Sequence, residues 1–352
     1  MDRREFLKST GAAAAASSAV ATGAAAAEAA PSAPATSRGL QRLRLAIAWQ
    51  DGFAGPADWA HRLALRIDGL SSGRWHVVPA FDVVDAHAAV ERGDADLCFA
   101  SADALIDAHR AFAYFAGLPG SRGLAPRQLQ SWIAIGGGQT LWDDLAGDAG
   151  IKPLLSAHSG PRSLMLATEP VETMGALGGR KAYVTGLARD VARGLGLDVV
   201  AVTPGGVSDA MHRGALDVAE LGGAIVSYAA GLPQAAPYTA GTQINRNGRA
   251  FFLGVRRAFW DGLPASDQAL LESAAAEEFR LSLAEEEVHG RLLHPAPPAH
   301  RVWTIAGELA HAIDRVAEAV VAHAAGSDAR SRRIADSHAA FRDTTVDAAA
   351  TA

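Results

Sequence analysis

The strongest constraint on the fold is an alternation of strand and helix patterns that begins near residue 42. A strand pattern alternates apolar and polar residues, whereas a helix pattern repeats apolar residues at intervals of three or four. These patterns alternate, starting with a strand, over residues 42–49, 56–70, 75–79, 86–90 and 96–100, with another helix from residue 102. This order predicts an α/β layer built on a mostly parallel sheet.

The same alternation starts again at residue 164. Strands are predicted at 164–167, 182–184 and 198–203, and helices at 187–194 and 208–213. From Pro264 onward the sequence is rich in alanine and glutamate, and one long helix is expected over 302–325. A chain of 352 residues has room for two lobes with separate cores. We therefore predict a two-lobed α/β protein whose ligand lies in the cleft between the lobes.

The N-terminus has the order of an export signal. Arg3 and Arg4 precede Phe6-Leu7-Lys8, a weakly apolar alanine-rich stretch covers 11–27, and small residues end at Ala30. The paired arginines predict a twin-arginine signal peptide over residues 1–30 and a linker over 31–40. No later apolar run approaches the ~20 residues that cross a bilayer. The expected location is the periplasm.

Charge and cysteine content exclude other classes. The net charge of −6 is spread along the chain, so no basic stripe is present to bind nucleic acid. The single cysteine, Cys98, lies in an apolar run and is expected to be a buried thiol, with no disulfide. The sequence contains no Gly-x-Ser-x-Gly, His-Glu-x-x-His, phosphate-binding or calcium-loop motif.

Three short stretches look like sites but have simpler interpretations. Gly194-Leu195-Gly196 follows a predicted helix and is interpreted as its C-terminal cap, not a dinucleotide fingerprint. Gly136-Gly137-Gly138 is interpreted as a break that lets two helices pack closely. Glu285-Glu286-Glu287, followed by His289, is interpreted as a solvated helix face because neighbouring residues on a helix point in different directions.

Several segments, in a fixed order, resemble the solute receptors of TRAP (tripartite ATP-independent periplasmic) transporters. The most specific is Trp132-Ile133-Ala134-Ile135-Gly136-Gly137-Gly138-Gln139-Thr140-Leu141-Trp142-Asp143. The other matching segments are 160–162, 179–181, 186–187, 214–220, 259–264 and 337–342. The chain is identified as similar to the DctP-like family, and in particular to the branch that binds α-keto acids.

The resemblance implies a periplasmic-binding-protein fold of type II-like design, with a hinge and long C-terminal helices. It implies one lobe from 41–160 with about 249–285, a second from 161–248 with about 286–300, and a C-terminal helix and tail over 301–345. It also implies a non-enzymatic receptor that binds a small organic acid and delivers it to membrane permease subunits. A homodimer through the C-terminal helix is part of the same expectation.

The resemblance also assigns candidate ligand-binding residues. The family's carboxylate-binding strand arginine falls at Tyr183, and its metal-binding glutamine falls at Arg162. Glu220 is retained, and Leu221 stands where the family has a tryptophan. We expect Arg162 to bind the ligand carboxylate while Tyr183, Glu220 and Leu221 shape the pocket. No catalytic residue is expected, since the standard catalytic motifs are absent. No cofactor or bound metal is expected either, because a guanidinium at position 162 would repel a metal ion from Glu220.

Two further candidates come from position alone. Trp49 and Gln50 end the first predicted strand, where cleft residues often lie, and Ser101 and Tyr114 are weaker candidates of the same kind. Two other functions stay open at this point. One is an orphan or sensor-linked receptor for an uncharged or non-carboxylate ligand, and the other is a periplasmic enzyme that uses Glu220 as a general base.

Overall fold

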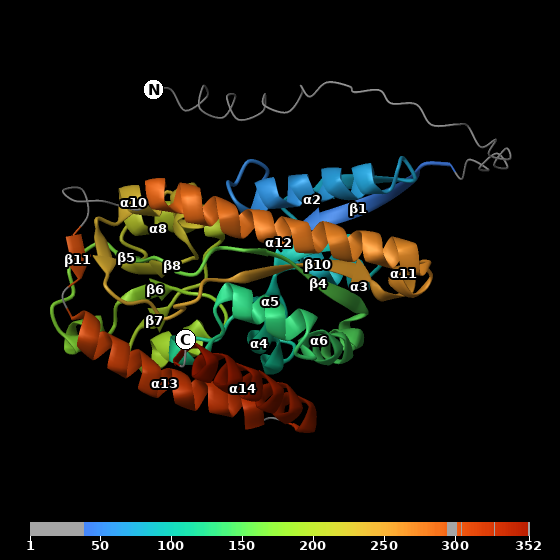
Figure 1. Cartoon of the computed structure of the whole chain (residues 1–352). Helices are drawn as coiled ribbons and strands as arrows, with labels where there is room; N and C mark the ends of the chain where they lie inside the picture. The colour runs from blue at the N-terminus through green and yellow to red at the C-terminus, as the bar shows by residue number, and fades with distance from the viewer. Residues whose placement is uncertain (1–38, 294–300, 304, 327, 351–352) are drawn as a thin grey trace, which may run out of the picture. The chain divides into compact units, whose positions relative to one another are not determined.

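The computed structural model describes residues 39–293, 301–303, 305–326 and 328–350 (Figure 1). The predicted signal peptide at 1–30 lies outside these residues. Two sheets and their surrounding helices make up the described part of the chain, which confirms the α/β prediction. No described helix has both the length and the apolar composition that a membrane span requires.

The first sheet has five strands in the order β2-β1-β3-β10-β4. β1 pairs in parallel with β2 and β3, whereas β10 runs antiparallel to both β3 and β4. The strands are β1 (Gln41–Ile47), β2 (Trp75–Ala80), β3 (Leu97–Ser101), β4 (Ile151–His158) and β10 (Ala250–Arg256). β10 returns to this sheet after the chain has formed most of the second one.

The second sheet has six short strands in the order β11-β9-β5-β8-β6-β7. β6 pairs in parallel with β7 and β8, and β5 pairs antiparallel with β8 and β9. The strands are β5 (Met165–Ala167), β6 (Lys181–Tyr183), β7 (Asp198–Val199), β8 (Val218–Glu220), β9 (Tyr238–Ala240) and β11 (Arg301–Trp303). Val302 therefore lies in a strand, and the long helix expected from that residue begins later.

The helices flank both sheets. They are α2 (Pro56–Leu70), α3 (Ala86–Glu91), α4 (Ala113–Ala116), α5 (Pro126–Ala134), α6 (Gly138–Ala146), α7 (Ala188–Gly194), α8 (Val207–His212), α9 (Ala224–Ala229), α10 (Leu232–Ala235), α11 (Arg257–Asp261), α12 (Ala265–Leu293), α13 (Ala306–Gly326) and α14 (Ala329–Ala350). The helix predicted from residue 102 is broken into the 3₁₀ turns η1 (Ala102–Leu105) and η2 (Arg110–Phe112) followed by α4.

Local sequence explains where these elements begin and end. α2 starts at Pro56, whose ring fits the first helical turn, and the Asp58 carboxylate accepts a hydrogen bond from the Gly55 N–H. Its buried face carries Trp59, Leu63 and Ile67 at helical spacing.

The two glycine motifs have the structural roles that the sequence predicted. Gly136 and Gly137 lie between α5 and α6, and a Cβ on Gly138, the first residue of α6, would lie 3.0 Å from Ile133 Cα in α5. Gly194 is the last residue of α7, so Gly194-Leu195-Gly196 ends a helix.

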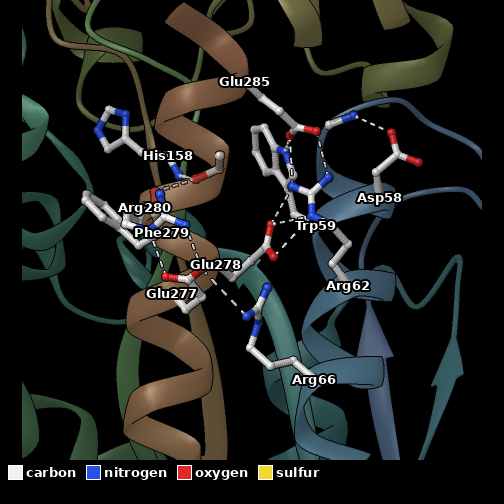
Figure 2. Close-up of polar contacts among 12 residues, drawn as sticks. Asp58, Trp59, Arg62, Arg66, His158, Glu277, Glu278, Phe279, Arg280 and Glu285 are labelled. Atoms are coloured by element: carbon white, nitrogen blue, oxygen red, sulfur yellow. Dashed lines mark hydrogen bonds and ion pairs between the residues drawn. The ribbon is translucent and has the colours of Figure 1, made fainter. Parts of the chain in front are cut away.

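The 29-residue helix α12 packs against β4, α2 and α9. In Figure 1 it runs alongside α2. Arg62 on α2 bonds two carboxylates of α12, Glu278 at 2.6 Å and Glu285 at 2.7 Å (Figure 2). The Ser282 hydroxyl accepts a hydrogen bond from the His158 backbone N–H. Side chains of α12 therefore bond both the neighbouring helix α2 and the strand β4 of the first sheet.

One α12 carboxylate reaches the second sheet's helices. Glu286 is buried and accepts hydrogen bonds from the backbone N–H groups of Ala224 and Ile225, at the start of α9. Burial raises the pKa of the Glu286 carboxyl to about 7. The interpretation of 285–287 as a solvated face is therefore wrong for Glu286, because this side chain caps a neighbouring helix.

The last two helices pack against one another and against different partners. α13 contacts α7, and Asp314 on α13 accepts a hydrogen bond from Arg246 at 3.0 Å. α14 packs on α5 and α6, where the His338 and Trp132 rings lie in a T-shaped arrangement. The C-terminal part of the chain thus covers surfaces of both sheets' helices.

Candidate functional site

A cavity of about 340 Å³ lies between the end of β3 and the edge of the second sheet. One wall comes from η1 and the residue before β10, and the other from β6, α7 and the segment 199–202. A narrower pocket shares Asp103, Thr185 and Arg249 with this cavity and extends to Asn245. The cavity is therefore lined by residues that lie far apart in the sequence.

Arg249 and Asp103 form a buried ion pair in one wall. The guanidinium Nε and Nη2 of Arg249 donate to Asp103 Oδ1 at 3.1 and 2.9 Å, and Nη2 also reaches Ser101 Oγ at 3.0 Å. Ser159 Oγ accepts a hydrogen bond from the Arg249 backbone N–H, and the Ser159 N–H donates to the Arg249 carbonyl. Both the backbone and the side chain of Arg249 are thereby fixed.

The remaining nitrogen of this guanidinium is open to the cavity. Arg249 Nη1 has no hydrogen-bond partner among the described residues, and it is not one of the buried unpartnered atoms. A planar guanidinium keeps its donors in a fixed fork, so the bonds from Nε and Nη2 to Asp103 also fix the direction of Nη1. The wall thus holds one oriented, charged donor.

Tyr183 ends β6 in the opposite wall and is buried. Its hydroxyl makes no hydrogen bond to any residue that the structure describes, and it is not a buried atom. Burial raises the pKa of this hydroxyl, which therefore stays protonated and can donate near neutral pH. The structure thus brings the predicted residue Tyr183 into the cavity, close to Arg249 and Asp103.

Thr185 and α7 complete this wall. Thr185 lines both pockets, and its hydroxyl also has no partner among the described residues. Arg189 donates to Gly186 O and to Asp107 at 2.6 Å, and Arg193 donates to Asp190 at 2.8 Å. Three open donors therefore face the cavity from two walls: Arg249 Nη1, Tyr183 Oη and Thr185 Oγ1.

Glu220 and Leu221 lie behind the cavity instead of lining it. Glu220 is fully buried, and its two carboxylate oxygens accept the backbone N–H groups of Ile244 at 2.8 Å and Asn245 at 2.6 Å. Burial raises the pKa of this carboxyl to about 7. Leu221 is a buried core residue beside it. Glu220 thus holds the loop from which Asn245 reaches the narrower pocket.

The other predicted residues fall outside the cavity lining. Arg162 is exposed in the irregular segment between β4 and β5 and does not line the cavity. Trp49 is buried against the rings of Phe99 and Phe251, and Gln50 is exposed with its amide near Gly205. The binding role predicted for these three residues is untested. Ser101, a weaker candidate, contacts the cavity arginine.

A family model places the chain among known proteins. The model for bacterial extracellular solute-binding proteins, family 7, matches residues 89–289, which is more than half of the chain. The chain belongs to this family. The matched range includes every cavity-lining residue named above, from Asp103 to Arg249.

Individual relatives agree with this membership. The chain is 24% identical over 244 residues to a monocarboxylate 2-oxoacid-binding periplasmic protein of Nostoc, and the match spans 67% of this chain and 65% of that protein. A TRAP transporter solute-binding protein from Bordetella bronchiseptica has the same fold, with a TM-score of 0.82 and 20% identity over 89% of this chain and 94% of its own. A counterpart from Pseudoalteromonas atlantica gives 0.79 and 20% over 87% and 95%.

The expectation that this solute-binding protein binds no metal ion is wrong. The Bordetella structure contains calcium with picolinate, and the Pseudoalteromonas structure contains sodium with pyruvate. The expectation rested on repulsion by Arg162, but that side chain is exposed and outside the cavity lining. Among the described residues, no three His, Cys, Asp or Glu side chains form a cluster that could hold an ion, and both Glu220 oxygens are already bonded. These residues alone therefore do not form a complete ion site.

The sequence did not reveal Arg249, Asp103 or Thr185 as site residues. Arg249 directly precedes the apolar run 250–255, and Asp103 follows the strand that ends at Ser101. For Arg249 and Asp103, a charged residue next to the end of an apolar strand is the one sequence signal available. The 146-residue separation between the partners hides the pairing itself.

Proposed function

We propose that this protein is the extracytoplasmic receptor of a TRAP transporter and that it binds a small organic acid in the cavity beside Arg249. The observation that carries the proposal is the set of three open donors on Arg249, Tyr183 and Thr185. Donors without a protein partner, directed at one cavity, are suited to a ligand that supplies acceptors. A carboxylate supplies two oxygens and prefers a guanidinium among its donors.

The ligands of similar proteins support a carboxylate. Solved structures of the same fold contain picolinate, pyruvate or pyroglutamate, and the Nostoc relative is named for monocarboxylate 2-oxoacids. Each of these compounds carries one carboxylate group. In this proposal Arg249 supplies the charged donor beside the cavity, and the carboxylate-binding role expected of Arg162 stays a prediction.

We propose further that the receptor performs no chemistry. Glu220, the candidate general base, lies outside the cavity lining, and both of its oxygens accept backbone N–H groups. The twin-arginine route through residues 1–30, the periplasmic location and delivery to membrane permease subunits belong to the same proposal. So does the homodimer, whose test is the mass in solution. In the structure α14 packs on α5 and α6 of its own chain.

The decisive variant is Tyr183→Phe. It removes only a hydroxyl that has no protein partner, so the fold should keep its stability while the ligand loses a donor. A hydrogen bond to a charged group contributes about 1.5–3 kcal/mol, which corresponds to a loss of about tenfold to a hundredfold in affinity. Calorimetric titration with pyruvate and other small 2-oxo acids measures this loss.

The control is Tyr238→Phe, which alters a tyrosine of the same sheet outside the cavity lining. Its affinity for each acid should equal that of the wild type. If the wild-type protein binds no organic acid, or if both variants bind as tightly as the wild type, the proposed binding mode is wrong.

A further inference from the structure

We infer that Asp103 limits the ligand to a single carboxylate, so that this residue determines the charge specificity of the receptor. The inference rests on the proposed function, because it concerns the same cavity. The proposed function requires only that an acid binds, whereas this inference fixes which acids are rejected and names the group that rejects them.

Asp103 is a built-in negative charge in the cavity wall. Its side chain is 7% exposed, lines both pockets and accepts three hydrogen bonds from Arg249. Although burial opposes ionisation, Arg249 and Ser101 hold the pKa of this carboxyl below its usual value. A Cβ on Gly186 would lie 3.2 Å from Asp103 Oδ2, so the opposite wall also contacts this carboxylate. The carboxylate is therefore ionised near neutral pH and lies beside the ligand space.

Every arginine among the described cavity-lining residues is already paired with a carboxylate. Arg249 pairs with Asp103, Arg189 with Asp107, and Arg193 with Asp190. The cavity thus offers oriented donors but no cation without a partner. One ligand carboxylate can share the Arg249 guanidinium through Nη1 and take further bonds from Tyr183 and Thr185.

The cavity disfavours a second carboxylate on the same ligand. It would find no uncompensated arginine among the lining residues, and it would lie in a cavity that also contains Asp103 and Asp107. Like charges repel strongly where burial excludes water. Binding proteins commonly obtain specificity from such a repulsive group placed against the wrong ligand. Asp103 is the stronger of the two, since the Asp107 side chain is 80% exposed and screened by solvent.

The test compares two acids that differ only at the far end of the chain: 2-oxopentanoate, with one carboxylate, and 2-oxopentanedioate, with two. The wild-type protein should bind the monoacid at least about tenfold more tightly. In Asp103→Asn this preference should shrink by about tenfold or more, because removing a like charge favours the diacid selectively. Titration calorimetry with both acids, on protein shown to be folded by its thermal melt, gives the ratio directly.

Asp96→Asn is the matched control. Asp96 pairs with Arg256 at 2.7 Å, at the other end of the same two strands β3 and β10, and neither residue lines the cavity. Its preference for the monoacid should match the wild type. If Asp103→Asn does not fold, Asp103→Ser removes the same charge and keeps a short acceptor for Arg249.

The outcomes separate the two proposals. If the wild type binds neither acid nor any other organic acid, the proposed function fails. If the wild type binds the diacid as tightly as the monoacid, the inference about Asp103 fails while the receptor function stands. It also fails if the Asp103 variants weaken both acids equally, since that result would mean a purely structural role.

Discussion

Two arginine–glutamate pairs that involve α12 carboxylates have similar distances but differ in burial, and this contrast makes a sharp stability prediction. Arg62 from α2 contacts Glu278 at 2.6 Å, and Arg280 contacts Glu277 at 2.7 Å on the helix surface (Figure 2). The Glu278 side chain is 0% exposed, whereas the Arg280 side chain is 62% exposed. Arg62→Ala should therefore be far more destabilising than Arg280→Ala.

The magnitude follows from the charge that is left behind. Removing one partner of a buried ion pair costs about 3–5 kcal/mol, because the other charge stays buried and unpaired. Arg62 is 30% exposed and also bonds Glu285, which has a second donor in Trp59 Nε1 at 2.9 Å. We therefore expect the lower end of the range, about 3 kcal/mol. Exposed pairs contribute little, so Arg280→Ala should leave stability unchanged.

Urea unfolding curves of the three proteins measure the difference at pH 7. A second signature is how the stability deficit of Arg62→Ala changes with pH. Burial raises the pKa of the Glu278 carboxyl, and Arg62 opposes that rise. With Arg62 present this pKa is already about 7, and without Arg62 it lies higher still. The folded variant therefore takes up the proton at a higher pH than wild type does, so the stability deficit of Arg62→Ala should shrink as the pH falls toward 7 from above. Equal unfolding midpoints for Arg62→Ala and Arg280→Ala would refute the reasoning.

Gly160→Ala should unfold at lower urea concentration than Gly150→Ala. Both residues have positive φ, but a Cβ at 160 would lie 2.1 Å from Glu286 Cγ, whereas one at 150 meets nothing within 4 Å. Burial lowers the pKa of His338 to about 3, so wild type should lose about 2 kcal/mol more stability than His338→Phe between pH 7 and pH 5, measured by urea titration. The buried Cys98 thiol, with its pKa raised to about 12, should react with a colorimetric thiol reagent only after unfolding.

Sequence periodicity predicted the elements that have one buried face. β1 and α2 were predicted from their alternation and helical spacing, and both lie within a few residues of the expected bounds. The sequence did not predict β4 and β10 as strands, although they pair with each other in antiparallel fashion along one side of the first sheet. Nearly all their residues are buried, so no polar face marks the two-residue period.

The site was predictable only where one residue carried the signal. Tyr183 was found because it occupies a family column at the end of a strand, and it lines the cavity. Arg249 and Asp103 acquire their role through each other, and no local pattern connects residues that lie 146 positions apart. Glu220 was recognised as an unusual carboxylate in an apolar run, but its partners are backbone N–H groups, which every residue possesses.

The contacts within one wall of the cavity differ from the contacts that join its two walls. Within one wall, Arg249 is bonded through its backbone to Ser159, and Asp103 is buried against it. Between the walls, Asp107 pairs with Arg189, and this pair contributes little in water because the Asp107 carboxylate is 80% exposed. Arg110 also pairs with Asp190 on α7. A ligand that bonds Arg249 on one wall and Tyr183 on the other adds contacts only when the walls are together, and it shifts the population toward that state.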